Sequence, residues 1–405
     1  MTDSLAAVLG QTSVATFAAE VWSRDMFFRR GDEGDDLSGL LTLDDVDELL
    51  SSRALRTPFL RIAKDGVVAP ASSFTRSGGV GATVSDQIDP DKVTQLLADG
   101  STVVFQGLHR AWRRIERFAT QLSIDLGHPV QANAYLTPSS ARGFAPHYDT
   151  HDVFVIQLAG SKHWTVHPPV VGRGTSIDDW THHRQEVVAA AQGAPVFDGT
   201  CDPGDVMYLP RGWIHSARAA EATSLHLTLG VHPYTERTVL DALIADAAEG
   251  LRVDNSLPAA IDLADAESMS GTIEVVRRTL IDALTTVKAE NVTARLAQRR
   301  GRDIRPRPLK PTLQVAAADS QSGDHPAKVR LRVGFTPRVE EHTNSVDLRL
   351  DEGTLTFERD HTAALRLIVA GTVFDATHLP GLDDATARAL VRRLLLAGVV
   401  APSQT

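Results

Sequence analysis

The chain has 405 residues, of which 42% are hydrophobic and 23% charged, as in ordinary globular proteins of two or three domains. Its formal net charge of −10 argues against a general nucleic-acid binder, because phosphate binding needs a positive surface. The single cysteine, Cys201, excludes an intramolecular disulfide and a cysteine-rich zinc site. The N-terminus has neither a basic segment nor a long apolar run, so we expect no secretion signal, no membrane span and a cytoplasmic location.

The first 50 residues divide into a helical and an acidic part. Residues 1–30 are predicted to be helical up to the aromatic cluster WSRDMFF. Residues 31–50 are rich in Asp and Glu, a pattern typical of a solvated loop and helix face. A dock for a basic peptide is the alternative interpretation.

Residues 100–232 carry the signals of a β domain. Short apolar or alternating runs are separated by Gly, Pro, Asp and Ser, as in STVVFQG, PVQANAYLTP, HDVFVIQLAG, KHWTVHPP, DVMYLP and SLHLTLGV. The stretch VFVIQLAGSKHWTV is predicted to be a hairpin with its turn at Ala-Gly-Ser. Many short strands at this spacing predict an antiparallel barrel or jelly roll.

After Pro233 the pattern becomes helical, with two apolar stripes of helical period that continue to about residue 300: Leu240, Leu243, Ile244 and Ala247, then Val276, Leu280 and Leu284. These stripes hold more apolar surface than two short helices can bury, so we expect a homodimer through this region. RRGRDIRPRPLKP and AAADSQSGDHP are predicted to be linkers, although the arginines of the first keep nucleic-acid binding open as an alternative.

The last 90 residues mix strands and helices. KVRLRV and SVDLRL alternate as strands do, and TAALRLIVAG is predicted to be a helix that ends at Gly371. LDDATARALVRRLLLAG is a strong helix with acids in its first turn and Gly398 just past its end. Its predicted buried face consists of Ala387, Leu390, Val391, Leu394 and Leu395. Such a segment is compatible with a winged-helix-like α+β domain.

The stretch PHYDTHDVFVIQLAGSKHW places three possible metal ligands before an apolar run. Side chains two apart share one face of a strand, so His147 and Asp149 can point together into a barrel. Two histidines and one carboxylate on one face of an ion form the triad of non-haem Fe(II) oxygenases. Among the other histidines we favour His215, in PGDVMYLPRGWIH, as the third ligand over His151. Either histidine alone would be read as a satisfied core residue.

These motifs together resemble one family. NAYLTP, GFAPHYDTHDVFVIQLAGSKHW, PGDVMYLPRGWIHSA and SLHLTLGV, within roughly residues 100–232, are similar to the JmjC-type 2-oxoglutarate oxygenases, and closest to the ribosomal oxygenases. The resemblance implies a double-stranded β-helix of the cupin type that binds Fe(II) through His147, Asp149 and His215. It also implies 2-oxoglutarate and O₂ as cosubstrates, with hydroxylated substrate, succinate and CO₂ as products.

The resemblance also implies residues for the cosubstrate. Lys162, across the predicted hairpin turn, matches the family cation that pairs with the distal carboxylate of 2-oxoglutarate, and its alternative is an exposed turn lysine. Asn133 matches a family Asn near the metal, and its alternative is a strand amide that satisfies backbone groups. Where relatives carry a Ser that helps hold the carboxylate, this chain has Gly230, and Thr228 on the same strand face is expected to substitute.

The predicted domains are a JmjC catalytic domain with a helical extension (1–232), a helical dimerisation domain (233–305) and a winged-helix-like domain (306–405). The favoured function is hydroxylation of a protein side chain, with a basic ribosomal protein as the candidate partner. A hydroxylase of a small-molecule or peptide natural product on the same scaffold is the first alternative. A non-catalytic cupin whose winged helix binds protein or DNA is the second, and the intact triad with Lys162 argues against it. A JmjC isomerase or zinc enzyme would use a different metal, which ligand type alone does not decide.

Overall fold

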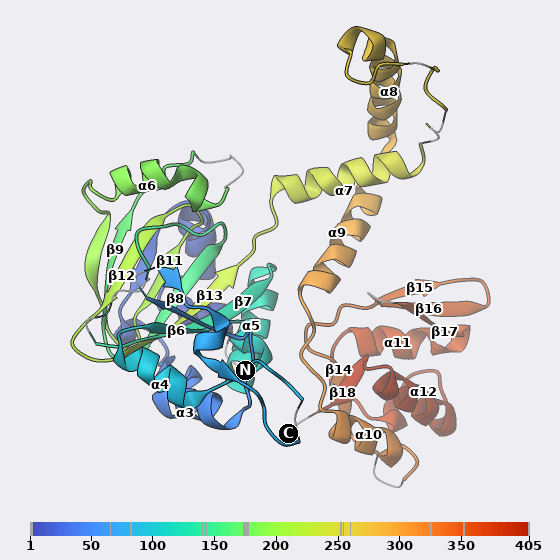
Figure 1. The fold of residues 1–405 in the computed structure, drawn as a ribbon. Helices are drawn as coiled ribbons and strands as arrows, with labels where there is room; N and C mark the ends of the chain where they lie inside the picture. The colour runs from blue at the N-terminus through green and yellow to red at the C-terminus, as the bar shows by residue number, and fades with distance from the viewer. Residues whose placement is uncertain are drawn as a thin grey trace. The chain divides into compact units, whose positions relative to one another are not determined.

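The computed structural model describes residues 3–64, 66–81, 83–139, 141, 144–172, 178–251, 253, 255–259, 261–323, 326–350 and 353–403. The chain forms two compact units, Met1–Pro233 and Tyr234–Thr405, and each is described by itself (Figure 1). No helix in the described ranges is long and apolar enough to cross a membrane.

The first unit is built on two antiparallel sheets, which confirms the predicted jelly-roll core. The larger sheet has the order β1-β11-β8-β13-β7-β6-β2-β3 and the smaller one the order β10-β9-β12. The strands of the larger sheet are β1 (Phe27–Arg29), β2 (Leu60–Lys64), β3 (Val67–Val68), β6 (Thr102–Phe105), β7 (Val130–Thr137), β8 (Asp152–Ala159), β11 (Val206–Leu209) and β13 (Ser224–Val231). Those of the smaller sheet are β9 (Lys162–His167), β10 (Phe197–Cys201) and β12 (Ile214–Ala219).

Strand β8 is apolar on both faces because both faces are covered. Phe154, Ile156 and Leu158 pack into the core beneath the helices, whereas Val153 and Val155 belong to a second cluster with residues of β9 and β11. The helices that contribute to the first core are α1 (Ser4–Leu9), α3 (Leu43–Ser52), α4 (Pro90–Ala98) and α5 (Arg113–Leu126). Burial on both sides explains why the run DVFVIQLA shows almost no polar alternation.

The predicted hairpin between β8 and β9 is wrong. Strand β8 pairs with β11 and β13, whereas β9 pairs with β10 and β12 in the other sheet. The chain crosses between the sheets at Gly160, whose φ is +56°, and a Cβ there would lie 2.2 Å from the carbonyl oxygen of Thr223. Only glycine fits this corner. The corner places Lys162 at the start of a strand in the sheet opposite β8.

The N-terminal prediction was partly wrong. Helix α1 is followed by the short helix α2 (Val14–Thr16) and a π-helical turn over Phe17–Val21, but Phe27–Arg29 form strand β1. This strand pairs with β11, with Phe27 opposite Tyr208. Pairing with a strand far along the chain decides its conformation, and a local pattern does not contain that information.

The second unit begins with the predicted helices, α7 (Glu236–Glu249), α8 (Ala266–Thr286) and α9 (Ala289–Asp303). The remaining elements are α10 (Pro311–Ser320), β14 (Val329–Leu331), β15 (Arg338–Glu341), β16 (Ser345–Leu350), β17 (Gly353–Glu358), α11 (Thr362–Val369), α12 (Asp384–Leu396) and β18 (Val400–Pro402). Strands β15, β16 and β17 form one antiparallel sheet, and β14 pairs with β18. The five predicted core residues of α12 are all buried.

Part of the predicted linker is instead a helix. Helix α10 starts at Pro311, a residue favoured in the first helical turn because it lacks the N–H that would be left unpaired there. Its buried Gln314 donates hydrogen bonds to the carbonyl oxygens of Leu395 and Val400, at 2.7 and 2.6 Å. These contacts attach the segment to the core of the second unit.

Candidate active site

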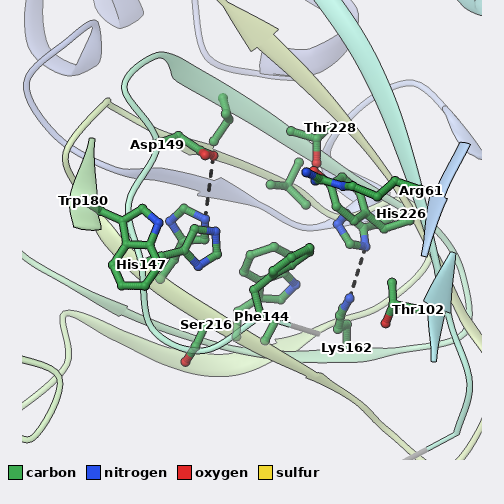
Figure 2. Close-up of a pocket in the computed structure, with 16 residues that line it drawn as sticks. Arg61, Thr102, Phe144, His147, Asp149, Lys162, Trp180, Ser216, His226 and Thr228 are labelled. Carbon is green, nitrogen blue, oxygen red and sulfur yellow. Dashed lines mark hydrogen bonds and ion pairs between the residues drawn. The ribbon is translucent and has the colours of Figure 1, made fainter. Parts of the chain in front are cut away.

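A cavity of about 240 Å³ lies in the first unit, lined by residues of both sheets and of the loop before β8 (Figure 2). Five of the six predicted site residues line it: His147, Asp149, Lys162, His215 and Thr228. The sixth, Asn133, is not among the lining residues, and its Oδ1 accepts a hydrogen bond of 2.9 Å from the backbone N–H of Gly107.

His147 and Asp149 precede β8 rather than lie within it, which corrects the expectation that they share a strand face. His147 instead forms a two-residue bridge with His215 on β12. The N–H of His147 donates to the carbonyl of His215 at 3.2 Å, and the N–H of His215 donates back at 2.8 Å. The two imidazole rings therefore lie beside each other, with centroids 4.5 Å apart.

Both imidazoles are oriented by backbone carbonyls. Nδ1 of His147 lies 2.8 Å from the carbonyl oxygen of Ala145, and Nδ1 of His215 lies 3.0 Å from that of Trp213. A carbonyl can only accept, so each Nδ1 carries the proton and each Nε2 keeps its lone pair. This is the tautomer of a histidine that binds a metal through Nε2, held in the usual way by the hydrogen bond of its other ring nitrogen. Burial and the neighbouring His215 lower the pKa of His147 to about 4, so His147 stays neutral at pH 7.

Asp149 faces this pair from the loop. One of its carboxylate oxygens lies 3.9 Å from Nε2 of His215, and its side chain is 34% exposed. Within the described ranges, no three His, Cys, Asp or Glu side chains already stand where they could hold a metal ion together. The donor types match a divalent metal, and the partly exposed carboxylate is the side chain with room to turn toward the two histidines.

The loop is fixed at its end by buried Asp152. Its carboxylate accepts hydrogen bonds from the Tyr208 hydroxyl at 2.7 Å, the Ser23 hydroxyl at 2.9 Å and the Arg211 backbone N–H at 3.0 Å. The carbonyl of Asp149 accepts from the N–H of Gly212 at 2.9 Å. These bonds attach the loop to the turn that leads into His215.

Lys162 forms the other end of the cavity. It is 2% exposed, and its Nζ donates to Thr137 Oγ1 at 3.1 Å and lies 3.5 Å from Nδ1 of His226. Burial lowers the pKa of Lys162 to about 7. No carboxylate among the described residues pairs with this ammonium group, so the lysine is available to an anionic ligand. The alternative of an exposed turn lysine is wrong, because the side chain is buried.

Gly230 has a packing role. A Cβ at this position would lie 2.7 Å from two atoms of the His151 ring. That ring also stacks on His232, with centroids 4.9 Å apart. His151 is not one of the cavity-lining residues, whereas Thr228, two residues before Gly230, is.

Several lining residues were missed by sequence reasoning: Arg61, Thr102, Tyr135, Phe144 and Trp180. His226, which also lines the cavity, was considered only as one of the histidines that could be the third metal ligand. Tyr135 could have been found, because it lies in NAYLTP and stacks on His226 from the paired strand, at 4.8 Å. Burial and the nearby Asp149 raise the pKa of Tyr135 to about 12, so it stays a hydroxyl donor. Arg61 offered no signal, since only the pairing of β2 through β6 to β7 brings it to the cavity.

Comparisons with known proteins agree with this site. Residues 105–239 match the family model described as the JmjC domain. Ribosomal oxygenase 1 of Gallus gallus is 28% identical over 288 residues, which cover 68% of this chain and 44% of the relative. Ribosomal oxygenase 2 of Bos taurus is 32% identical over 177 residues, which cover 42% of this chain and 37% of the relative. The chain thus spans less than half the length of these two curated relatives.

The fold is shared with a solved structure. The ribosomal oxygenase YcfD of Escherichia coli matches with a TM-score of 0.53 and 16% identity, over 97% of this chain and 98% of the other. Another structure of that protein, in complex with cobalt and 2-oxoglutarate, has a TM-score of 0.52 and 15% identity, over 96% of this chain and 98% of the other. These two structures show that the fold is shared, whereas the match to the JmjC domain model and the two curated relatives confirm the resemblance to JmjC-type oxygenases of the ribosomal oxygenase branch.

Proposed function

Residues 105–239 are a JmjC domain, and from this premise we propose that the chain is an Fe(II)- and 2-oxoglutarate-dependent oxygenase that hydroxylates a side chain of a protein substrate. One observation carries the proposal. Two histidines, each with an unprotonated Nε2, and a carboxylate line one side of a cavity. A buried lysine, which pairs with no carboxylate among the described residues, lines the other side.

His147, Asp149 and His215 would hold the iron, and Lys162 would bind the distal carboxylate of 2-oxoglutarate. Thr137 positions Lys162 by accepting its hydrogen bond, and Thr228 faces the same cavity. Asn133 remains a proposed cosubstrate residue, although its Oδ1 already accepts a hydrogen bond. When bound, the iron would supply the activation of O₂ that accompanies conversion of 2-oxoglutarate to succinate and CO₂. The apolar and aromatic walls limit the access of water to this reaction.

The proposed substrate is a ribosomal protein. Proteins named ribosomal oxygenases are among the similar sequences, and one from Drosophila mojavensis, 41% identical over 109 residues (25% of this chain and 11% of the relative), is named a bifunctional lysine-specific demethylase and histidyl-hydroxylase. A basic ribosomal protein also suits a chain whose net charge is −10. Mass spectrometry of ribosomal proteins from strains with and without this gene tests the proposal. One peptide should be about 16 Da heavier when the gene is present, since a single oxygen atom is added.

The same comparison separates the alternatives. A small-molecule or natural-product hydroxylase would convert 2-oxoglutarate but leave every ribosomal peptide unchanged in mass. A non-catalytic binding protein would do neither. If purified iron-loaded protein forms no succinate and no ribosomal peptide changes, the proposed function is wrong.

We also propose the division into catalytic (1–232), dimerisation (233–305) and winged-helix-like (306–405) domains. In α8 none of the described residues is buried, and Ile273, Val276 and Ile281 are exposed. A second copy of the chain would cover these apolar residues. The combination of short antiparallel sheets and helices after residue 306 supports the winged-helix-like assignment. A cytoplasmic location without a nucleic-acid partner completes the proposal.

A further inference from the structure

Arg61 lies in one row of side chains across the larger sheet. It pairs with Val104 on β6, Val104 pairs with Tyr135 on β7, and Tyr135 pairs with His226 on β13. Residues directly opposite one another in a sheet point to the same face. Arg61 therefore reaches into the cavity from the edge side, and Figure 2 shows its side chain extending toward Thr228.

Among the residues that the structure describes, none is a hydrogen-bond or ion-pair partner of the Arg61 guanidinium group. Its Nε is buried without a hydrogen bond, and none of the ion pairs among the described residues includes it. Its contact is with the Phe144 ring, whose centroid lies 5.8 Å away. A buried guanidinium N–H that stays unpaired is costly, so this group is suited to an acceptor that arrives with a ligand.

Among the described residues, the charges in the cavity leave Arg61 without a counterion even when iron and 2-oxoglutarate are bound. Among the described lining residues only Arg61, Asp149 and Lys162 carry charge. The two charges of Fe(II) offset those of 2-oxoglutarate, and the charge of Asp149 offsets that of protonated Lys162. The net charge of the filled cavity is therefore the single positive charge of Arg61, and the aromatic side chains of Tyr135, Phe144 and Trp180 line the same cavity.

We propose that Arg61 is a specificity-determining residue that binds an oxygen acceptor of the substrate and disfavours arginine or lysine at the hydroxylated position. The acceptor is a carbonyl, amide or carboxylate oxygen. A cationic target side chain would meet a like charge in a partly dehydrated cavity, which is unfavourable. This inference rests on the proposed function, because the charge balance assumes iron and 2-oxoglutarate.

The test uses the full chain loaded with Mn(II), which shortens the proton relaxation times of molecules bound nearby. The probes are acetyl-glutamine amide, acetyl-lysine amide and 2-oxoglutarate, each measured by NMR against the zinc-loaded protein. In the wild-type chain with 2-oxoglutarate present, we expect the glutamine probe to show at least three times the manganese effect of the lysine probe. Arg61→Glu should reduce that ratio to one or below, and Arg61→Gln should give an intermediate value.

The control is Lys64→Glu, which makes the same charge reversal on the same strand. Lys64 is exposed and forms an ion pair with Asp99 at 2.7 Å, so this variant should keep the wild-type ratio. Thermal melting checks that the variants fold, and Arg61→Gln serves if Arg61→Glu does not. Equal effects of the two amide probes on the wild type, or an unchanged ratio in both Arg61 variants, would overturn the inference. The inference would also be overturned if Arg61→Gln lost as much affinity for 2-oxoglutarate as Lys162→Ala does, because Arg61 would then bind the cosubstrate. If manganese has no effect on 2-oxoglutarate in the wild type, the proposed function fails and this inference fails with it.

Discussion

His147 and His215 lie far apart in the sequence, yet each donates its backbone N–H to the carbonyl of the other, at 3.2 and 2.8 Å. The bridge joins the loop before β8 to strand β12. It holds the two imidazoles side by side before any ligand arrives, with their Nδ1 atoms already directed to backbone carbonyls. Part of the entropic cost of assembling a metal site is therefore met during folding.

Replacement of His215 by Ala should weaken Fe(II) binding by well over tenfold, because loss of even an outer partner of a metal ligand typically costs ~10–100-fold. His151→Ala is the matched control, since that ring packs on Gly230 and His232 and does not line the cavity. Anaerobic calorimetric titration measures both. If His151→Ala abolishes binding and His215→Ala preserves it, the ligand assignment is wrong.

Replacement of Lys162 by Ala should leave Fe(II) binding intact but weaken 2-oxoglutarate binding. Removal of one partner of a buried charge pair costs about 2–5 kcal/mol, which corresponds to roughly 30- to 3,000-fold in affinity. Lys162→Arg should retain part of the affinity, because the positive charge remains. Titration of 2-oxoglutarate into the metal-loaded variants checks this, with Lys64→Ala as an exposed control on β2. An unchanged affinity in Lys162→Ala would mean that another cationic side chain binds the distal carboxylate of 2-oxoglutarate.

The ligand-free protein should become more stable as pH rises from about 7 toward 10.5. The pKa of Lys162 is about 7 in the folded state and near 10.5 in the unfolded chain, so between these values the unfolded state binds a proton that the folded state does not. The contribution to the free energy of unfolding is at most about 1.4 kcal/mol per pH unit. Urea unfolding at pH 7, 8 and 9 should show this gain in the wild type relative to Lys162→Met. Parallel pH profiles of the two proteins would show that Lys162 is already charged when folded.

In solution the chain should be a dimer through the α7–α9 region. Val276→Asp places a charge in the exposed apolar stripe of α8 and should halve the mass measured by light scattering at micromolar concentration. Val275→Asp is the matched control, because consecutive residues of a helix point in directions about 100° apart. A wild-type mass equal to one chain would remove the dimer from the proposal.

Patterns of local period predicted much of the fold. The core face of α12 was predicted residue by residue, because a helix repeats its apolar positions within one segment. The strands of the jelly roll were also located from their composition. The pairing of the strands was not predicted correctly. The error at Gly160 shows why, because a turn inside a hairpin and a corner between two sheets use the same small residues.

The residues of the site likewise fall into those that a sequence motif identifies and those that depend on strand pairing. His147, Asp149, His215 and Lys162 were predicted because each belongs to a motif, and the structure brings all four to one cavity. Thr137 and Arg61 depend on sheet register, through the Thr137 contact with Lys162 and the row from β2 to β13. Asn133 was expected from resemblance alone, and its hydrogen bond to Gly107 could not be seen in the sequence.

The register of the smaller sheet sets the spacing between His215 and Lys162, which lie at opposite ends of the cavity. On the paired strands β9 and β12, His215 lies opposite Val166 and Lys162 lies opposite Ala219. Along β12, the backbone from His215 to Ala219, the partner of Lys162, spans roughly 13 Å at about 3.3 Å per residue. A rigid sheet thus fixes the distance between His215, a proposed metal ligand, and Lys162 at the other end of the cavity. Among 2-oxo dicarboxylic acids it would select by chain length, so oxaloacetate would be too short to engage both ends and 2-oxoadipate too long to fit between them.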